Sequence, residues 1–165
     1  MKIVTRLVFL AVLGGLGFWL WIILFPSPEK AVLKKIASLA ATATFSTDAS
    51  NLTRAGKVNR VVGMFTSDAQ IILNASSPGG HTFSGSDEIR AAALGGFGSL
   101  PSLKVEFLDA TAKVSPDQQN AEVNCTAKIS TGSSKDFGVQ EMQFQLKQLD
   151  GSWVITRVET VKTLQ

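Results

Sequence analysis

The chain has 165 residues, of which 45% are hydrophobic and only 18% charged, and its mean hydropathy is +0.20. Intrinsically disordered chains are poor in apolar residues and rich in charge, so this composition excludes a disordered protein. With one cysteine and one histidine, the chain can form no intrachain disulfide and no cysteine-based or multi-histidine metal site.

The apolar residues are concentrated near the N-terminus. An uncharged run of 19 residues covers 7–25 and follows a short basic tail, residues 1–6. As a helix this run would be about 28 Å long, close to the hydrocarbon thickness of about 30 Å. It is longer than a signal-peptide core and no small-x-small cleavage site follows it, so we expect an uncleaved transmembrane signal anchor rather than a cleaved signal peptide.

The charges around this run predict its orientation. Lys2 and Arg6 favour a cytoplasmic N-terminus, which puts the rest of the chain outside the cytoplasm, in the periplasm or the extracellular space. Lys30, Lys34 and Lys35 pull the other way. Residues 29–165 carry 14 Lys and Arg and 13 Asp and Glu, and no basic stripe interleaved with aromatics, so we expect no nucleic-acid partner.

Two helices are predicted after a linker at 26–29. The linker holds a serine suited to capping, a proline for the first helical position and an acid for the first turn, and apolar residues then recur at helical spacing to about Thr44. After a polar break at 46–51, apolar residues recur at steps of three or four from Leu52. This spacing predicts a second helix that ends near Met64.

Two short strands and a third helix are predicted next. The strands cover 69–73 and 81–84, on either side of a Pro-Gly-Gly loop at 76–80. Ser86 can cap the third helix, and the glycines and proline of 95–101 end it.

Four long strands complete the predicted fold. Alternation of apolar and polar residues is cleanest over 121–129, which predicts a half-buried strand, and Asp150-Gly151 is a hairpin signal. The apolar phase changes between Val139 and Met142, which predicts a β-bulge near Gln140. The order therefore predicts an α+β domain with three helices on one side of a strongly curved antiparallel sheet.

Three segments, in this order and spacing, resemble the nuclear-transport-factor-2-like superfamily, in its polyketide-cyclase-like (SnoaL-like) branch. They are MFTSDAQIIL at 64–73, HTFSGSDEIRAA at 81–92 and LDGSWVITRVE at 149–159. The resemblance implies that 30–165 is one cone-shaped domain, with a bent antiparallel sheet wrapped against three helices around a cavity. The superfamily includes isomerases, dehydratases, cyclases, ligand binders and interaction domains, so the fold does not fix the function.

Two residues are candidates for acid–base chemistry in such a cavity. His81 is the only histidine and a natural general base near neutral pH, although it is also placed like a surface histidine after the Pro-Gly-Gly turn. Asp68 matches the superfamily's aspartate between helix and strand, and its alternative is a residue that caps a turn.

The expected ligand pocket is mainly aromatic. Arg157 and Glu159 fall in phase with Trp153, so as a pair they could orient a polar ligand, unless a bulge returns them to solvent. Glu141 and Asp109 have the same ambiguity, and Cys125 reads as a buried free thiol. The full expected lining is Phe65, Phe83, Phe107, Phe144, Trp153, Arg157 and Glu159.

These observations leave two functions. The first is a membrane-anchored binding or interaction domain outside the cytoplasm, held by residues 7–25 in the bilayer, whose cavity takes a small apolar ligand or a partner protein. The alternative is an isomerase, dehydratase or cyclase type of enzyme with His81 as general base. Neither requires a cofactor or a metal, and the resemblance also implies a possible homodimer through the sheet.

Overall fold

The computed structural model describes residue 15 and residues 27–73, 80–132 and 137–161. Within these ranges, no helix is long and apolar enough to cross a membrane. The predicted anchor at 7–25 lies outside the described residues except for Gly15, and so does the basic tail.

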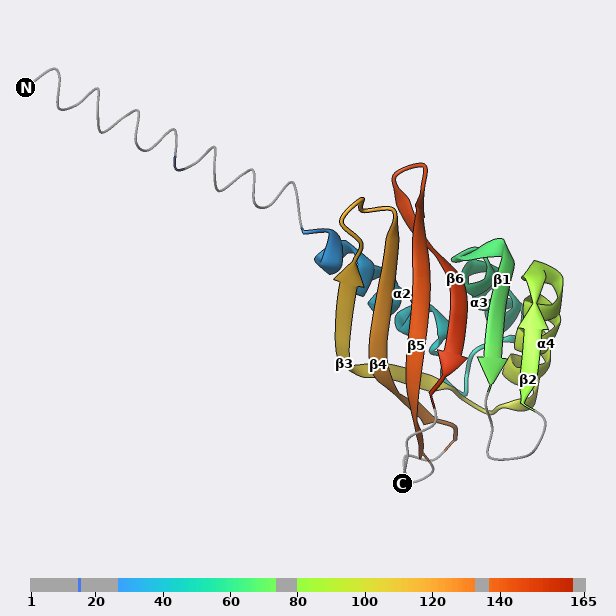
Figure 1. Ribbon diagram of the computed structural model, residues 1–165. Coiled ribbons are helices and arrows are strands. Elements are labelled where there is room, and N and C mark those ends of the chain that lie inside the picture. The colour runs from blue at the N-terminus through green and yellow to red at the C-terminus, as the bar shows by residue number, and fades with distance from the viewer. Residues whose placement is uncertain (1–14, 16–26, 74–79, 133–136, 162–165) are drawn as a thin grey trace, which may run out of the picture.

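Three helices and six strands make up the described domain, in the predicted order (Figure 1). The helices are α2 (Pro28–Ala43), α3 (Asn51–Val62) and α4 (Gly85–Ser99). The strands are β1 (Phe65–Leu73), β2 (His81–Ser84), β3 (Lys104–Val114), β4 (Asn120–Ser130), β5 (Phe137–Leu149) and β6 (Ser152–Thr160).

The first two helices begin at serine caps, and the cap of the first is the serine predicted in the linker. The Ser27 hydroxyl accepts a hydrogen bond from the Lys30 amide at 3.4 Å, and the Ser50 hydroxyl accepts one from the Thr53 amide at 3.2 Å. These bonds satisfy amide groups that have no partner within the first turn of a helix.

The third helix differs from its prediction at both ends. Its cap position is Ser84 rather than Ser86, and the Glu88 carboxylate accepts a hydrogen bond from the Ser84 amide at 2.7 Å. The glycine-rich stretch that was expected to end the helix is helical as far as Ser99. Glycine disfavours a helix by only about 1 kcal/mol per residue, which tertiary contacts can offset.

Arg54 of α3 supplies those contacts at the end of α4. Its guanidinium donates hydrogen bonds to the carbonyl oxygens of Phe97 at 3.1 Å, Leu100 at 2.7 Å and Pro101 at 3.0 Å. It also lies 4.7 Å from the ring centroid of Phe45, which packs on the Phe97 ring. Carbonyls at a helix end lack internal partners, so one arginine both closes α4 and ties it to α3.

The strands form one sheet in the order β2-β1-β6-β5-β4-β3. The four long strands form the predicted antiparallel meander, but β1 runs parallel to β6, so the sheet is mixed and the prediction of a fully antiparallel sheet was wrong. Hairpin turns in a sequence indicate pairing only between consecutive strands. Because β1 and β6 come from opposite ends of the domain, no turn in the sequence indicates that they pair.

The register also corrects the predicted bulge. Strands β4 and β5 pair without interruption past Gln140, and Val139 is simply an apolar residue on the exposed face. The register shifts elsewhere: on β3, where Asp109 and Ala110 stand opposite one residue of β4, and on β6 at Thr156. Asp109 has a φ of 51°, the left-handed conformation that some bulges require.

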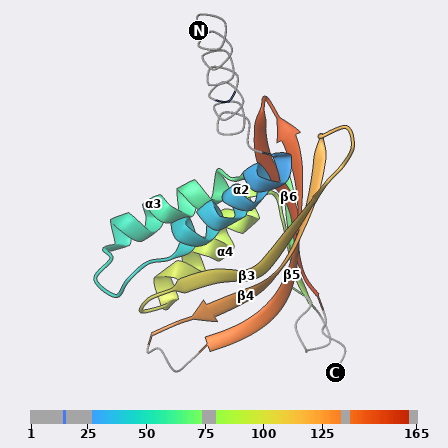
Figure 2. The ribbon, with the colours of Figure 1, turned by 90° about the vertical axis from the view of Figure 1, so that its left-hand side faces the viewer.

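All three helices cover one face of the sheet, which bends around them (Figure 2). The main core lies between α2 and the long strands, where Val32 and Ile36 meet Phe144, Leu146 and Ile155, all under 3% exposed. A second, smaller cluster joins α3 and α4 to β1. Among the described residues, no helix lies on the other face of the sheet (Figure 2).

Replacing Arg54 with methionine tests whether this contact holds the helical end of the domain together. We expect Arg54→Met to lower the free energy of unfolding by about 2 kcal/mol, because partly buried carbonyls would lose their donor. Urea unfolding measures the change. Arg60→Met, at an exposed position of the same helix, is the matched control, and equal effects of the two changes would contradict the prediction.

Candidate functional site

An apolar cavity of about 200 Å³ lies between the helices and the covered face of the sheet. Helices α2 and α3 supply one wall, and strands β1, β3, β4, β5 and β6 supply the other. Every described residue that lines it is apolar: Leu39, Ala40, Ala43, Val61, Phe65, Ile71, Val105, Phe107, Ala127, Ile129, Met142, Phe144 and Val158.

Small side chains account for this space. Along α2, the large residues Val32 and Ile36 fill the contact with the sheet, whereas Ala40 and Ala43 in the last turns do not reach across it. Ala127 of β4 lies on the wall opposite them. A small side chain in a position that a larger one could fill leaves an empty volume.

Three of the predicted aromatic residues line the cavity. Phe107 and Phe144 meet edge to face, with ring centroids 5.3 Å apart, and Phe65 joins them from β1. Phe83 instead packs in the cluster beneath α3 and α4, and Trp153 is buried beside the start of α2.

The predicted polar pair lies on the opposite face of the sheet. The bulge at Thr156 shifts the alternation of β6 by one residue, so Val158 faces the core and Arg157 and Glu159 face outward. The Arg157 guanidinium donates to one Glu159 carboxylate oxygen at 2.9 Å and to the Gln70 side chain at 3.3 Å. The sequence left open whether this pair faces the pocket or is returned to solvent by a bulge, and the structure shows the bulge.

Neither candidate acid–base residue lines the apolar cavity. His81 is exposed at the start of the edge strand β2, opposite Leu73. Asp68 is exposed within β1 rather than in a turn, and interaction with the neighbouring Thr66 side chain lowers the pKa of its carboxyl group. A general base at neutral pH needs a pKa near 7, so the lowered pKa makes Asp68 a weaker base for such a role.

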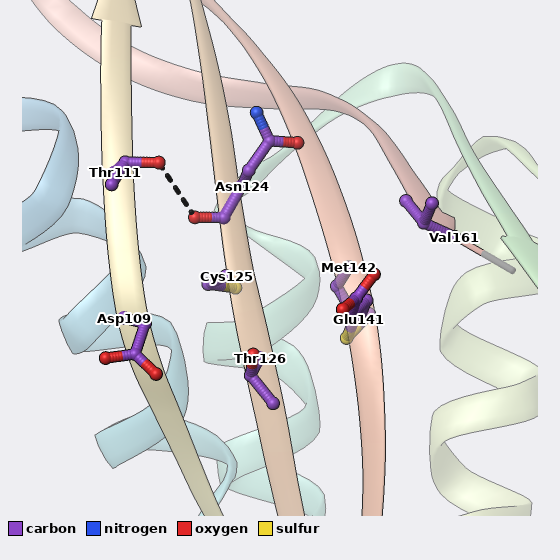
Figure 3. Close-up of a pocket in the computed structure, with 8 residues that line it drawn as sticks. All are labelled: Asp109, Thr111, Asn124, Cys125, Thr126, Glu141, Met142 and Val161. Atoms are coloured by element: carbon purple, nitrogen blue, oxygen red, sulfur yellow. Dashed lines mark hydrogen bonds between the residues drawn. The ribbon is translucent and has the colours of Figure 1, made fainter. Parts of the chain in front are cut away.

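A second recess, of about 230 Å³, lies on the sheet face without helices (Figure 3). Asp109 of β3 and Glu141 of β5 flank Thr126 of β4, and Thr111 donates to the Asn124 carbonyl at 3.5 Å. A bulge in β3 places Asp109 in this recess. The sequence shows that Asp109 interrupts the apolar face of β3, but it does not indicate a bulge. Within the described ranges, no group of three or more His, Cys, Asp or Glu residues gathers to hold a metal.

No family model matches the sequence, and no curated protein matches it. Solved structures do match the fold. An NTF2-like protein with a cystatin-like fold from Novosphingobium aromaticivorans has 17% identity and a TM-score of 0.61 over 79% of each chain.

Two further proteins of that bacterium are similar to this chain. One, a candidate scytalone dehydratase, has 14% identity and a TM-score of 0.61 over 82% of this chain and 83% of its own. The other, a candidate aromatic ring hydroxylase, has 12% identity and a TM-score of 0.64 over 82% and 88%. Similarity at these identities establishes an NTF2-like α+β fold and no particular reaction.

The thiol of Cys125 provides a test of how the covered sheet face is packed. Burial raises the pKa of this thiol to about 11, from an ordinary value of 9.0. We therefore expect it to react slowly with Ellman's reagent at pH 8 in the folded protein and rapidly in urea.

The same shift predicts how stability depends on pH. Below pH 9.0 the thiol is protonated in both states, but above it the unfolded chain loses its proton first, so stability falls as pH rises towards about 11. Cys125→Ser should remove this part of the pH dependence in urea titrations. Fast labelling of the native thiol would show that β4 is open at this position.

Proposed function

We propose that this domain is a binding module whose cavity takes a small apolar molecule about the size of one aromatic ring. The observation that carries the proposal is the purely apolar lining of the 200 Å³ cavity. Cavities of about 150 Å³ with such linings stay dry and bind benzene-sized ligands.

The apolar lining also predicts which ligands the cavity would accept and which it would reject. Binding would derive from removing apolar surface of the ligand from water and from contacts with the rings of Phe107 and Phe144. A charged ligand would lose its hydration without gaining a partner, at a cost of several kcal/mol, on the order of that for burying an unpaired charge. We therefore infer selection by size and shape.

A cofactor-independent isomerase, dehydratase or cyclase is the alternative function. What favours it is the name of one structural neighbour, the candidate scytalone dehydratase. Such an enzyme needs a base within hydrogen-bonding reach of its bound substrate. Because His81 and Asp68 are exposed and absent from the described lining, the binding function has more support.

We further propose that residues 7–25 anchor the domain in a membrane, with the domain outside the cytoplasm. The support is in the sequence: the uncharged run of 19 residues and the position of Lys2 and Arg6 before it. Helix α2 begins at Pro28, so at most two residues separate it from the proposed span.

Met142 provides a direct reporter of the cavity, because the chain has only three methionines and Met142 lines this space. In protein labelled with ¹³C at methionine methyl groups, we expect toluene to shift the Met142 resonance saturably. Ala127→Leu should fill the cavity and abolish the shift, because the larger side chain occupies the ligand's volume.

Two variants control this experiment. Ala91→Leu adds the same atoms at an exposed position of α4, and His81→Gln removes the proposed base, so both should retain the toluene shift. An unchanged Met142 signal in saturating toluene would refute the ligand-binding proposal. Loss of the shift in His81→Gln would show that His81 contributes to this cavity, contrary to the described lining.

A charge in the middle of the proposed span tests the anchor. Leu16→Arg should release the protein into the soluble fraction at alkaline pH, since an arginine at the centre of a membrane helix costs about 3 kcal/mol on insertion scales. The unaltered protein and Leu16→Phe should stay with the membrane. Extraction of the unaltered protein would overturn the anchor.

A further inference from the structure

A recess of about 280 Å³ lies between the first turns of α2 and the hairpin that joins β5 to β6. Helix α2 lines it with Ala31, Lys34, Lys35 and Ser38, and β6 lines it with Ser152 and Trp153. It is separate from the apolar cavity and shares none of the described residues that line it.

The charged residues that line this recess are both lysines. Lys34 and Lys35 line it, and none of its described lining residues is a carboxylate. The ion pairs formed within the described ranges involve neither lysine. Glu29 is nine residues before Ser38, which at about 100° per residue puts it on the opposite side of the helix.

The chemistry of the lining suits a phosphate group. The two ammonium groups are point charges that pair with phosphate oxygens, and the hydroxyls of Ser38 and Ser152 are hydrogen-bond donors. Trp153 is only 7% exposed, so it provides a fixed wall rather than a mobile one. Indole rings of this kind are also common at the boundary between headgroups and acyl chains.

The position of the recess identifies the source of the phosphate. Lys35 is seven residues after Pro28, about 10 Å along α2. The polar headgroup layer on each side of a bilayer is about 5–8 Å thick. If the span ends at Phe25, Lys35 follows it by ten residues, about 15 Å at the helical rise. The recess then lies just outside the headgroup layer, and the long lysine side chains can extend back towards it.

We propose that this recess binds the phosphate of an anionic phospholipid in the bilayer that the span crosses. Bound there, the headgroup joins α2 to the β5–β6 hairpin and fixes the tilt of the domain on the membrane. This inference rests on the anchor proposed above and is independent of the ligand in the apolar cavity.

Amine labelling of the full chain in lipid nanodiscs tests the proposal. We expect an N-hydroxysuccinimide ester to modify Lys34 and Lys35 about fivefold more slowly in phosphatidylglycerol than in phosphatidylcholine, as mass spectrometry of the peptides would show. Lys113, an exposed residue of β3, is the internal control and should react equally in both lipids.

A pair of double variants separates the recess from general attraction to an anionic surface. Native mass spectrometry should find less phosphatidylglycerol retained by Lys34→Gln/Lys35→Gln, and no loss for Lys30→Gln/Lys113→Gln, which removes the same charge outside the recess lining. Equal losses would overturn the recess as a site.

The remaining outcomes distinguish this inference from the anchor and from a soluble ligand. Resistance to alkaline extraction together with equal labelling of Lys34 and Lys35 in both lipids would overturn the recess alone. Extraction of the unaltered protein would overturn the anchor and this inference with it. Protection by free glycerol phosphate in phosphatidylcholine discs, equal to that by phosphatidylglycerol, would assign the recess to a soluble phosphate instead.

Discussion

The packing of α2 across the bent sheet is the contact on which the rest of the domain depends. Val32 and Ile36 are almost completely buried against Phe144, Leu146 and Ile155, and this contact unites residues from both ends of the domain. The change from large residues to alanines along the same helix leaves the last turns out of full contact with the sheet. Different residues of this one helix therefore contribute to the main core and to the wall of the cavity.

The two faces of the sheet have different chemistry because one is covered and the other is not. Glu122, Asn124 and Gln143 lie on the open face, where the Asn124 amide donates to Glu122 at 3.0 Å and accepts from Gln143 at 3.3 Å. The Arg157–Glu159 pair extends this polar network towards β1. Exposed pairs of this kind contribute little to stability, about 0–1 kcal/mol each. Their effect is to keep the open face in contact with water rather than packed against another element.

The fold by itself carries little functional information. It matches 316 chains among the solved structures, and the neighbours include proteins named for different reactions. Function has to be argued from the sites instead. In this domain the described lining of the cavity is apolar, whereas Asp109 and Glu141 lie on the other face of the sheet, a separation that suits binding of an apolar molecule better than acid–base chemistry.

The sequence by itself determined the order of helices and strands, the serine cap of α2 and the Asp150-Gly151 turn. These features follow from local rules: helical and strand periodicity, capping and turn chemistry act over a few residues. Only the tertiary structure decided the parallel pairing of β1 with β6, the helical end of α4 and the outward direction of Arg157 and Glu159. The first two depend on partners distant in the chain, and the third depends on a one-residue bulge. A bulge moves every later side chain of the strand to the opposite face of the sheet, and the sequence of those later residues gives no sign of it.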